Sequence, residues 1–548
     1  MVFPPRLLAW ARRPWAAENL GWTLSAAAML AGLLLRLWSI RQARFSGEES
    51  WFWSIGCDIA TGKSFPVLGH PISGTAARHP GSAFFWLLGL TQLGAPSPLR
   101  AYALFSLGGL VVLGPLAAAV ARAFDRPTAV AFLVLSALSP WWIVYTNSSW
   151  PSYLIPTLCA LVLVWLPSLA VTTVTTMPAG AGGAGQGGAF AQGALAFLLV
   201  IGFQVHLSAL HFWLITLVTF AVWRPRPRRP LLLGLALGAL CYLPYLIHEV
   251  GHGFANTLAI VHRSQGGGRS WYVLQGLLLY FVGFTTTDVS YLWNQGFWHS
   301  FDLARFWRGA GIEQTNAFFA GAGWGKTGGL LCWVGLVATW TFTVLSWLMF
   351  ARVLWRRLRP GSQASQPENV LLVAFVTAVA GIPFLYLLSG KGGYPHYVST
   401  VLPLAFLPPA YLLGRLLARP LARWGAVIYL LLFASAGFLG LRGYYAVDSR
   451  WSVPQTTAAV QFILDRTRSA EGVGHYRPFK LVYGFSPNWP AAYQLTAAHV
   501  FGAPFLNTGA GDVFMVEARL PGAPSAVTGD ALVLPTLTVV HQPANVSR

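Results

Sequence analysis

Long apolar runs separated by clusters of arginine constrain this chain more strongly than any other feature. A helical run of about 20 apolar residues is long enough to cross a lipid bilayer. Short basic loops between such runs mark the cytoplasmic side of a membrane protein. The clusters comprise Arg6, Arg12, Arg13, Arg122, Arg126, Arg224, Arg226, Arg228, Arg229, Arg352, Arg356, Arg357, Arg359, Arg415, Arg419 and Arg423. The chain is therefore predicted to be an all-α polytopic membrane protein whose orientation is set by these clusters.

Composition argues against the main soluble alternatives. The 548 residues are 55% hydrophobic and 9% charged, which is not expected of a chain of several soluble domains. The net charge of +20 could indicate a nucleic-acid partner, but basic cytoplasmic loops and contact with anionic lipid headgroups account for it. None of the 4 cysteines has a spacing that indicates a disulfide or a metal site. Membrane lipids, and no nucleic acid, are the expected surroundings.

The hydropathy pattern predicts about eleven membrane-spanning helices. With residues 1–21 in the cytoplasm, every arginine cluster falls on the cytoplasmic side. The apolar segment 82–93 has only about a dozen residues, so it is expected to lie in the membrane interface. The predicted spans are residues 22–40, 100–121, 127–146, 152–172, 189–204, 207–223, 230–249, 328–350, 369–389, 397–414 and 424–442.

Three large regions are predicted on the outer side. Two are loops within the transmembrane domain 22–442, at residues 41–99 and 251–327. The third is the tail 443–548, which is predicted to form a small α/β extracytoplasmic region. A helix is expected at 456–466 and strand-like runs at 480–485 and 531–540. The stretch 271–284 of the second loop could form a surface helix.

An acidic pair directly follows the first predicted span. Glu48 and Glu49 lie on the outer side, and a carboxylate there can act as a general base or bind a metal ion. In an arbitrary protein such a pair is more often the solvated start of a loop. Only 16 Asp and Glu residues occur in the whole chain, so a functional role is favoured here.

Other polar residues occur at several separate outward-facing ends of the predicted spans. Arg78 and His79 precede the interfacial segment, where a cation at headgroup height can bind a lipid phosphate. Each residue alone could equally be an interface anchor or a helix-packing residue. Their convergence on one side is the stronger signal. The further candidates are Gln204, His206, Glu249, Lys391, Tyr394, His396 and Tyr397.

These motifs together resemble the GT-C membrane glycosyltransferases. The similarity is to glycosyltransferase family 39 and the bacterial aminoarabinose-transferase-like proteins, and it covers roughly residues 20–440. Glu48 and Glu49 stand where the family has an Asp-Glu pair, and residues 78–80 match its Lys-Pro-Pro element loosely. The segment 139–151, with Trp150, resembles the family's second outer loop. Further resemblances are at residues 204–208, at 244–249 and at His396 and Tyr397 before Pro403.

The resemblance implies a transferase that takes a sugar from a polyprenyl-phosphate carrier and inverts the anomeric centre. Glu48 or Glu49 would deprotonate the acceptor, a lipid, glycan or protein. Arg78, His79, Lys391 and His396 would neutralise the donor phosphate. Gln204, His206, Glu249, Tyr394, Tyr397 and Trp150 would bind substrate. The implied location is the bacterial cytoplasmic membrane, with the site facing the periplasm or the cell exterior.

The sequence departs from the family at the acidic pair and in the second outer loop. Glu48 replaces the usual Asp, and residues 147–152 contain no acid. No cofactor is established by the motifs, and a role for a divalent cation is left open.

Three other classes of protein fit the sequence less well. A transporter is expected to have acids or broken helices near mid-membrane and internal repeats, and the sequence shows neither a clear repeat nor a mid-span acid. An oligosaccharide ligase or polymerase would rely on Arg and His in a late outer loop instead of an early acidic pair. A noncatalytic scaffold would not need Glu48, His206 and Glu249 to converge.

Overall fold

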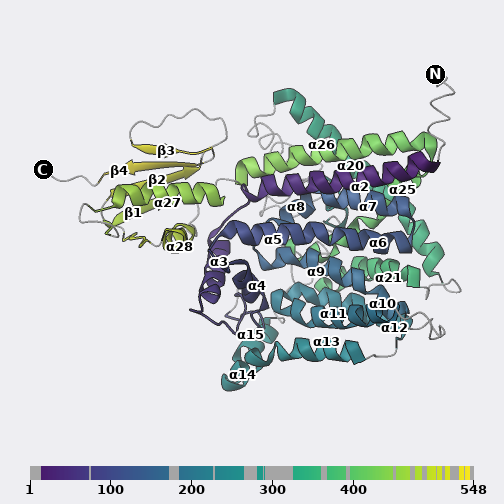
Figure 1. The fold of residues 1–548 in the computed structure, drawn as a ribbon, viewed down its shortest axis with the longest axis horizontal. Coiled ribbons are helices and arrows are strands. Elements are labelled where there is room, and N and C mark those ends of the chain that lie inside the picture. The colour runs from purple at the N-terminus through teal and green to yellow at the C-terminus, as the bar shows by residue number, and fades with distance from the viewer. Residues whose placement is uncertain are drawn as a thin grey trace.

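The computed structural model shows a bundle of long helices with a small α/β unit at one end (Figure 1). It describes residues 14–72, 76–171, 184–225, 229–263, 280–287, 289, 325–359, 367–389, 395–448, 452–469, 475–483, 490–501, 503–508, 512–518, 530–535 and 537–543. The predicted surface helix at 271–284 lies mostly outside these residues.

Each predicted span corresponds to a helix or a bent pair of helices. Eight helices of the described residues are long and apolar enough to cross a membrane, two bent pairs pass the same test together, and residues 207–223 form a shorter apolar helix. The chain is a multi-pass membrane protein. Its bundle comprises α2 (Pro14–Ile40), α5 (Pro98–Val111), α6 (Leu113–Ala123), α7 (Arg126–Leu138), α8 (Pro140–Thr146), α9 (Pro151–Trp165), α10 (Pro167–Val171), α11 (Ala184–Val205), η1 (Leu207–Ala209), α12 (Leu210–Trp223), α13 (Arg229–Leu240), α14 (Leu243–Gly251), α20 (Gly325–Leu358), α21 (Val370–Val376), α22 (Ile382–Ser389), α24 (Leu402–Ala405), α25 (Leu407–Leu417) and α26 (Pro420–Asp448).

Two spans predicted as continuous helices are broken. The axes of α7 and α8 differ by 56°, and those of α13 and α14 by 45°. A proline lies in the first turn after each break, at Pro140 and Pro244. Proline has no N–H and disfavours a helical residue before it, so each helix ends and restarts in a new direction.

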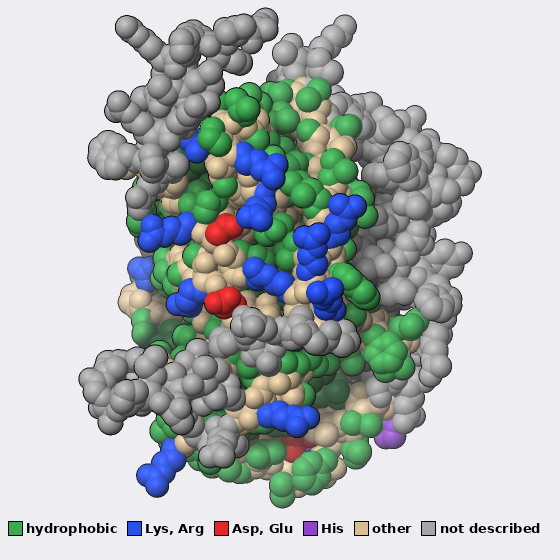
Figure 2. Space-filling model, turned by 90° about the vertical axis from the view of Figure 1, so that its right-hand side faces the viewer, with side chains coloured by type: hydrophobic (Ala, Val, Ile, Leu, Met, Phe, Trp, Pro, Cys, Tyr) green, Lys and Arg blue, Asp and Glu red, His purple; other side chains and the backbone are tan. Residues whose placement is uncertain are grey.

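Arginines gather at the end of the bundle away from the α/β unit (Figure 2). There Arg357 donates to the Ala123 carbonyl at 2.8 Å, and Arg415 lies 3.9 Å from the Asp125 carboxylate. These contacts join clusters that are far apart in sequence. Several arginine clusters therefore share one end of the bundle, as the sequence predicts.

The opposite end carries the short helices of the outer loops. These are α3 (Gly47–Ala60), α4 (Ala83–Thr91), α15 (Ala255–Arg263) and α23 (Pro395–Val398). α4 has 9 residues, which is too short to span a bilayer and agrees with the interfacial segment predicted at 82–93.

The tail folds into a mixed sheet with two helices, which confirms the predicted α/β region. Strands β1 (Phe479–Tyr483), β2 (Asp512–Ala518), β3 (Ala531–Val533) and β4 (Leu537–Gln542) are ordered β1-β2-β4-β3. β1 and β2 are parallel and the other pairs are antiparallel. Helices α27 (Val453–Thr467) and α28 (Pro490–Val500) complete the unit. The run 531–540, predicted as one strand, is a hairpin, because the chain turns between Leu534 and Leu537 at Pro535.

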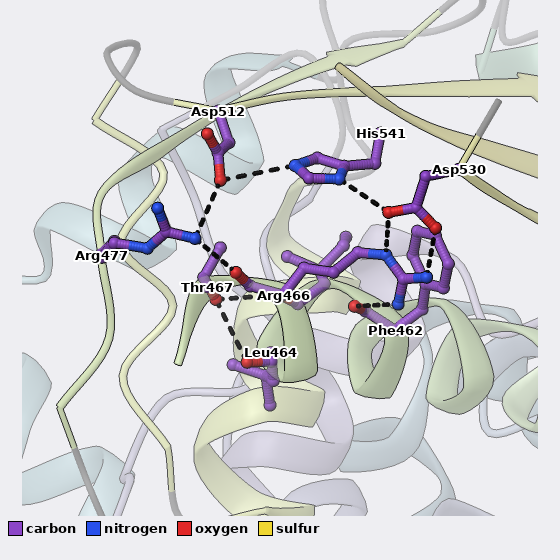
Figure 3. Close-up of polar contacts among 9 residues, drawn as sticks. Phe462, Leu464, Arg466, Thr467, Arg477, Asp512, Asp530 and His541 are labelled. Carbon is purple, nitrogen blue, oxygen red and sulfur yellow. Dashed lines mark hydrogen bonds and ion pairs between the residues drawn. The ribbon is translucent and has the colours of Figure 1, made fainter. Parts of the chain in front are cut away.

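A polar network joins α27 to the edge of the sheet (Figure 3). Arg466 holds Asp530 with both ends of its guanidinium, one bond measuring 2.6 Å. His541 lies between Asp530 at 2.8 Å and Asp512 at 3.4 Å, and Arg477 lies 3.3 Å from Asp512. Hydrogen bonds from Arg466 and His541 lower the pKa of the Asp530 carboxyl to about 2. The network therefore fixes α27 against β2 and β4.

The α/β unit packs directly on α3. His499 of α28 lies 3.0 Å from the Ser54 hydroxyl, and its ring contacts the Trp53 ring at 5.3 Å. Phe45 and Trp53 share a hydrophobic core with Phe479 of β1. The tail therefore supports the helix that carries the acidic pair.

Candidate functional site

The N-terminus of α3 separates the two acids of the pair. Ser46 and Glu49 form a capping box, in which the Ser46 backbone N–H donates to the Glu49 carboxylate at 2.7 Å. The next residue along a helix points about 100° away. Glu48 is accordingly exposed, whereas Glu49 is 2% exposed.

Glu49 also ties α3 to the segment 147–150 that follows α8, the part of the chain that resembles the family's second outer loop. The Ser148 hydroxyl donates to Glu49 at 2.9 Å and accepts from the Trp150 backbone N–H at 3.1 Å. The neighbouring Asn147 side chain donates to the Ser39 hydroxyl and accepts from the Ser106 hydroxyl. This buried polar layer holds the loop, including Trp150, against α3.

Both carboxyl groups have raised pKa values. Burial raises the pKa of Glu49, and the charge of Arg44 and the hydrogen bonds from Ser46 and Ser148 oppose that shift. Partial desolvation raises the pKa of Glu48 in the same direction, again against Arg44. A carboxylate with a raised pKa is a stronger base, and of these two acids only Glu48 is exposed.

A short hairpin packs beside α3. The Gly69 N–H donates to the His79 carbonyl and the His79 N–H donates to the His70 carbonyl, both at 2.9 Å. Pro71 pairs with Arg78 in an isolated antiparallel bridge. His70 and His79 therefore face each other across two hydrogen-bonded backbone segments.

Arg78 is held on this hairpin from two sides. Its guanidinium lies 5.9 Å from the Trp51 ring of α3, within the range of a cation–π contact. The Asn256 side chain accepts from the Arg78 N–H at 2.6 Å and donates to the Arg78 carbonyl at 3.0 Å. The half-buried Arg78 side chain is thus placed next to the helix that bears Glu48.

Glu249 lies behind this clamp. Its carboxylate accepts from the Thr257 backbone N–H at 2.8 Å, and the Thr257 hydroxyl contacts the Tyr245 hydroxyl at 2.9 Å. Tyr245 in turn accepts from Asn256 at 3.2 Å. Glu249 is 1% exposed and is linked to Arg78 through Thr257, Tyr245 and Asn256.

Three buried imidazoles meet where the hairpin touches the bundle. The His70 and His79 rings stack at 3.7 Å, and the His206 ring lies 5.8 Å from His70 and 5.1 Å from His79. Burial lowers the pKa of His70 and of His79 well below the usual value, and each shift is reinforced by a neighbouring histidine. Both rings are therefore neutral at physiological pH.

His206 enters this cluster from the break between α11 and η1. Its backbone is extended and its Nδ1 contacts the Ser208 hydroxyl at 3.0 Å. The Tyr397 ring of α23 stacks on it at 5.7 Å. Gln204 is buried against Gly81, where an added Cβ would collide with the glutamine side chain. The break thus joins the loop 41–99, through His70 and His79, to α23.

The contacts above link most of the sequence-predicted site residues at one end of the bundle. They connect Glu49, Trp150, Arg78, His79, Gln204, His206, Glu249 and Tyr397. Glu48 joins this group only as the neighbour of Glu49 on α3. Lys391 and Tyr394 lie outside the described residues, as does the side chain of His396. His70, Ser148 and Asn256 were not predicted to take part. For His70 the sequence did contain an indication: like His79 it precedes a proline, which favours an extended backbone at both histidines.

Comparison with solved structures identifies the fold. ArnT from Cupriavidus metallidurans, in a crystal structure bound to undecaprenyl phosphate, is similar over 95% of this chain and 98% of its own, with a TM-score of 0.50 and 13% identity. The oligosaccharyltransferase of Archaeoglobus fulgidus, crystallised with Zn and sulfate, matches 90% of this chain and 68% of its own, with a TM-score of 0.49 and 13% identity. No protein-family model matches the sequence, and no curated protein sequence matches it significantly. The chain has a GT-C-like fold, as the sequence resemblance implied.

Proposed function

We propose that the protein is a membrane glycosyltransferase that takes a sugar from a polyprenyl-phosphate carrier and passes it to a lipid, glycan or protein acceptor. The observation that carries the proposal is the placement of Glu48 and Arg78 in a GT-C-like fold. An exposed carboxylate and a braced guanidinium lie on adjoining elements at one end of the bundle. A base and an anion-binding group are what this reaction requires.

In the proposed reaction, Glu48 removes the proton from the acceptor hydroxyl as its oxygen attacks the anomeric carbon. The bond between that carbon and the phosphate oxygen breaks, and the polyprenyl phosphate leaves with the electron pair. Attack opposite the leaving group inverts the anomeric centre. Arg78 neutralises the charge that develops on the phosphate, and its planar fork suits two phosphate oxygens. Lys391 and His396 are proposed as further phosphate ligands.

The remaining candidates divide by burial. Glu49, almost fully buried and doubly hydrogen-bonded, is proposed to position α3. Glu249 is proposed to support Arg78 through the chain of contacts formed by Thr257, Tyr245 and Asn256. Trp150 and Tyr397 are partly exposed and are proposed, with Tyr394, to contact the sugar or its carrier. Gln204 is buried against Gly81, and the same role is proposed for it from the floor of the site.

The proposed location is the bacterial cytoplasmic membrane, with the site and the tail in the periplasm. The support is the arginine-rich opposite end, which is the composition of a cytoplasmic surface (Figure 2). A reporter that is active only in the periplasm, fused after Arg548, should be active. Activity of a cytoplasm-specific reporter at the same position would reverse the orientation.

Reconstituted protein tests the function. It should be incubated with a panel of polyprenyl-phosphate sugars and candidate acceptors, and the products identified by mass spectrometry. Glu48→Gln keeps size and hydrogen bonding but removes basicity, so turnover should fall by about a hundredfold or more. Glu517→Gln, at an exposed acid on β2, is the matched control and should retain turnover.

Two results would contradict the proposal. One is wild-type turnover in Glu48→Gln, which would remove Glu48 from the reaction. The other is movement of a donor across the bilayer without any sugar transfer, which would assign the protein to transport instead.

A further inference from the structure

We infer that His70, His79 and His206 form a binding site for a late first-row divalent metal ion of the Zn²⁺ class. Their candidate ligand nitrogens all lie within 4.8 Å of one another. The three side chains are 6%, 3% and 8% exposed. The inference concerns metal binding and does not depend on the proposed sugar transfer.

The nitrogen atoms of the two hairpin histidines support this inference. Nδ1 of His70 and Nδ1 of His79 are buried, and neither has a hydrogen-bond partner among the described residues. A buried polar atom left without a partner destabilises the folded state. One bound metal ion would satisfy both atoms at once, so the pair is accounted for by a shared ligand.

Backbone structure keeps the ligands close. The His70 and His79 backbones are hydrogen-bonded to each other, and their rings already stack at 3.7 Å. Ligand nitrogens about 2.0–2.1 Å from a tetrahedral Zn²⁺ lie roughly 3.3 Å from one another. The nitrogen–nitrogen separations, now up to 4.8 Å, therefore need to shorten toward this value. Side-chain rotations that move each nitrogen by about 1 Å are enough to bring all three to bonding distance of one ion.

His206 has the oriented second shell that metal-binding histidines use. Its Nδ1 accepts from the Ser208 backbone N–H at 3.2 Å and lies 3.0 Å from the Ser208 hydroxyl, so its Nε2 would be the ligand atom. A metal ion on Nε2 would place the proton on Nδ1, which would then donate to the Ser208 hydroxyl instead of accepting from the backbone N–H. Ser208 is itself buried, which keeps the contact away from solvent.

The ligand set selects the class of metal. Imidazole nitrogens suit Zn²⁺ and its late transition-metal neighbours, whereas Mg²⁺ and Ca²⁺ prefer oxygen. Three histidines also leave one coordination position open for water or another oxygen ligand. The ion would tie the first outer loop to the break after α11.

Metal content of the full-length protein tests the site. Protein without a polyhistidine tag should be loaded with ZnCl₂, desalted and measured by inductively coupled plasma mass spectrometry. The wild type should retain one ion per chain. His79→Gln and His206→Gln should each weaken Zn²⁺ binding by more than the ~10–100-fold typical of an outer-shell change.

His252→Gln is the matched control. His248 and His252 form a stacked histidine pair at the end of α14, where His252 is exposed. Its loss should leave the retained ion in place. Retention of the ion in both cluster variants, with loss in His252→Gln, would move the site to that pair and overturn the inference.

If a cluster variant does not fold, spectroscopy of the wild-type protein still tests whether the three histidines bind the metal ion. X-ray absorption of the Zn²⁺-loaded protein should show an imidazole-rich shell, and the Co²⁺ form should show tetrahedral d–d bands. A wild type that retains no metal after desalting, or a shell made of oxygen ligands, would overturn the inference.

Discussion

Replacing Glu49 by alanine should destabilise the protein at the base of the acidic helix. The Glu49 carboxylate is 2% exposed and accepts from the Ser46 backbone N–H at 2.7 Å and the Ser148 hydroxyl at 2.9 Å. Glu49→Ala removes both acceptors together. The Ser46 N–H then has no partner at the helix start, and the second outer loop loses its tie to α3.

The expected loss follows from these two contacts. Removing a side chain that caps a helix start costs about 0.5–2 kcal/mol, and leaving a buried donor without a partner costs about 1–3 kcal/mol. Burial of the charged carboxylate offsets part of this, as its raised pKa indicates. A net loss of about 2–4 kcal/mol is expected for Glu49→Ala. Glu49→Gln should lose less than about 1.5 kcal/mol, because its oxygen can accept from Ser46 while its amide donates to Ser148.

A double-mutant cycle measures the contact itself. Unfolding by SDS, followed by circular dichroism, should be compared for Glu49→Ala, Ser148→Ala and the double variant. Groups in direct contact are expected to couple by about 0.5–3 kcal/mol. Glu48→Ala is the control one residue away, and as an exposed side chain it should change stability by less than about 0.5 kcal/mol.

Two outcomes would refute this reasoning. If Glu48→Ala destabilises as much as Glu49→Ala, the division of the pair by burial is wrong. If the two single variants add without coupling, Glu49 does not hold the second outer loop through Ser148.

Three further predictions concern separate parts of the molecule. Arg78→Ala should weaken use of a polyprenyl-phosphate donor by about 1.5–3 kcal/mol in kcat/KM, the range of a hydrogen bond to a charged group, with the thermal midpoint nearly unchanged. Gly81→Ala should lower the thermal midpoint more than Gly62→Ala, because both glycines have positive φ but only at Gly81 would a Cβ meet a neighbouring side chain. Ionised Asp530, whose pKa falls from 3.8 to about 2 on folding, stabilises the tail above pH 3.8, and that contribution is lost as the pH falls toward 2. In acid titrations followed by tryptophan fluorescence, Asp530→Asn should lack this step; an unchanged step would contradict the role of the Arg466 pair.

The spans were predictable because hydropathy and arginine placement are local properties of the chain. A run of apolar residues must be helical in lipid, since its backbone has no other hydrogen-bond partners there. The bends after residues 138 and 240 were missed by length alone, although Pro140 and Pro244 were visible in the sequence. Likewise, Pro535 interrupts the run 531–540, which becomes a hairpin because proline cannot donate within a sheet.

Which of the two adjacent acids points inward depends on where α3 begins. The sequence indicates that start only through its capping residues. Ser46 and Glu49 have the S-x-x-E spacing of a capping box, and this spacing identifies Glu49 as the acid that turns back to the helix start. Glu48 then points away from that contact. The tie to Ser148 was not predictable, because nothing local relates a hydroxyl in the second outer loop to α3.

The histidine cluster shows how a local backbone preference can build a site that spacing does not reveal. His70 and His79 each precede a proline, and a residue before proline is pushed toward extended backbone. Two extended segments close in sequence can pair as a hairpin, which places the two imidazoles face to face. His206 is also extended, at a helix break far along the chain. Only the packing of that break against the hairpin brings in the third ring, so two members of the site were open to prediction and the third required the tertiary fold.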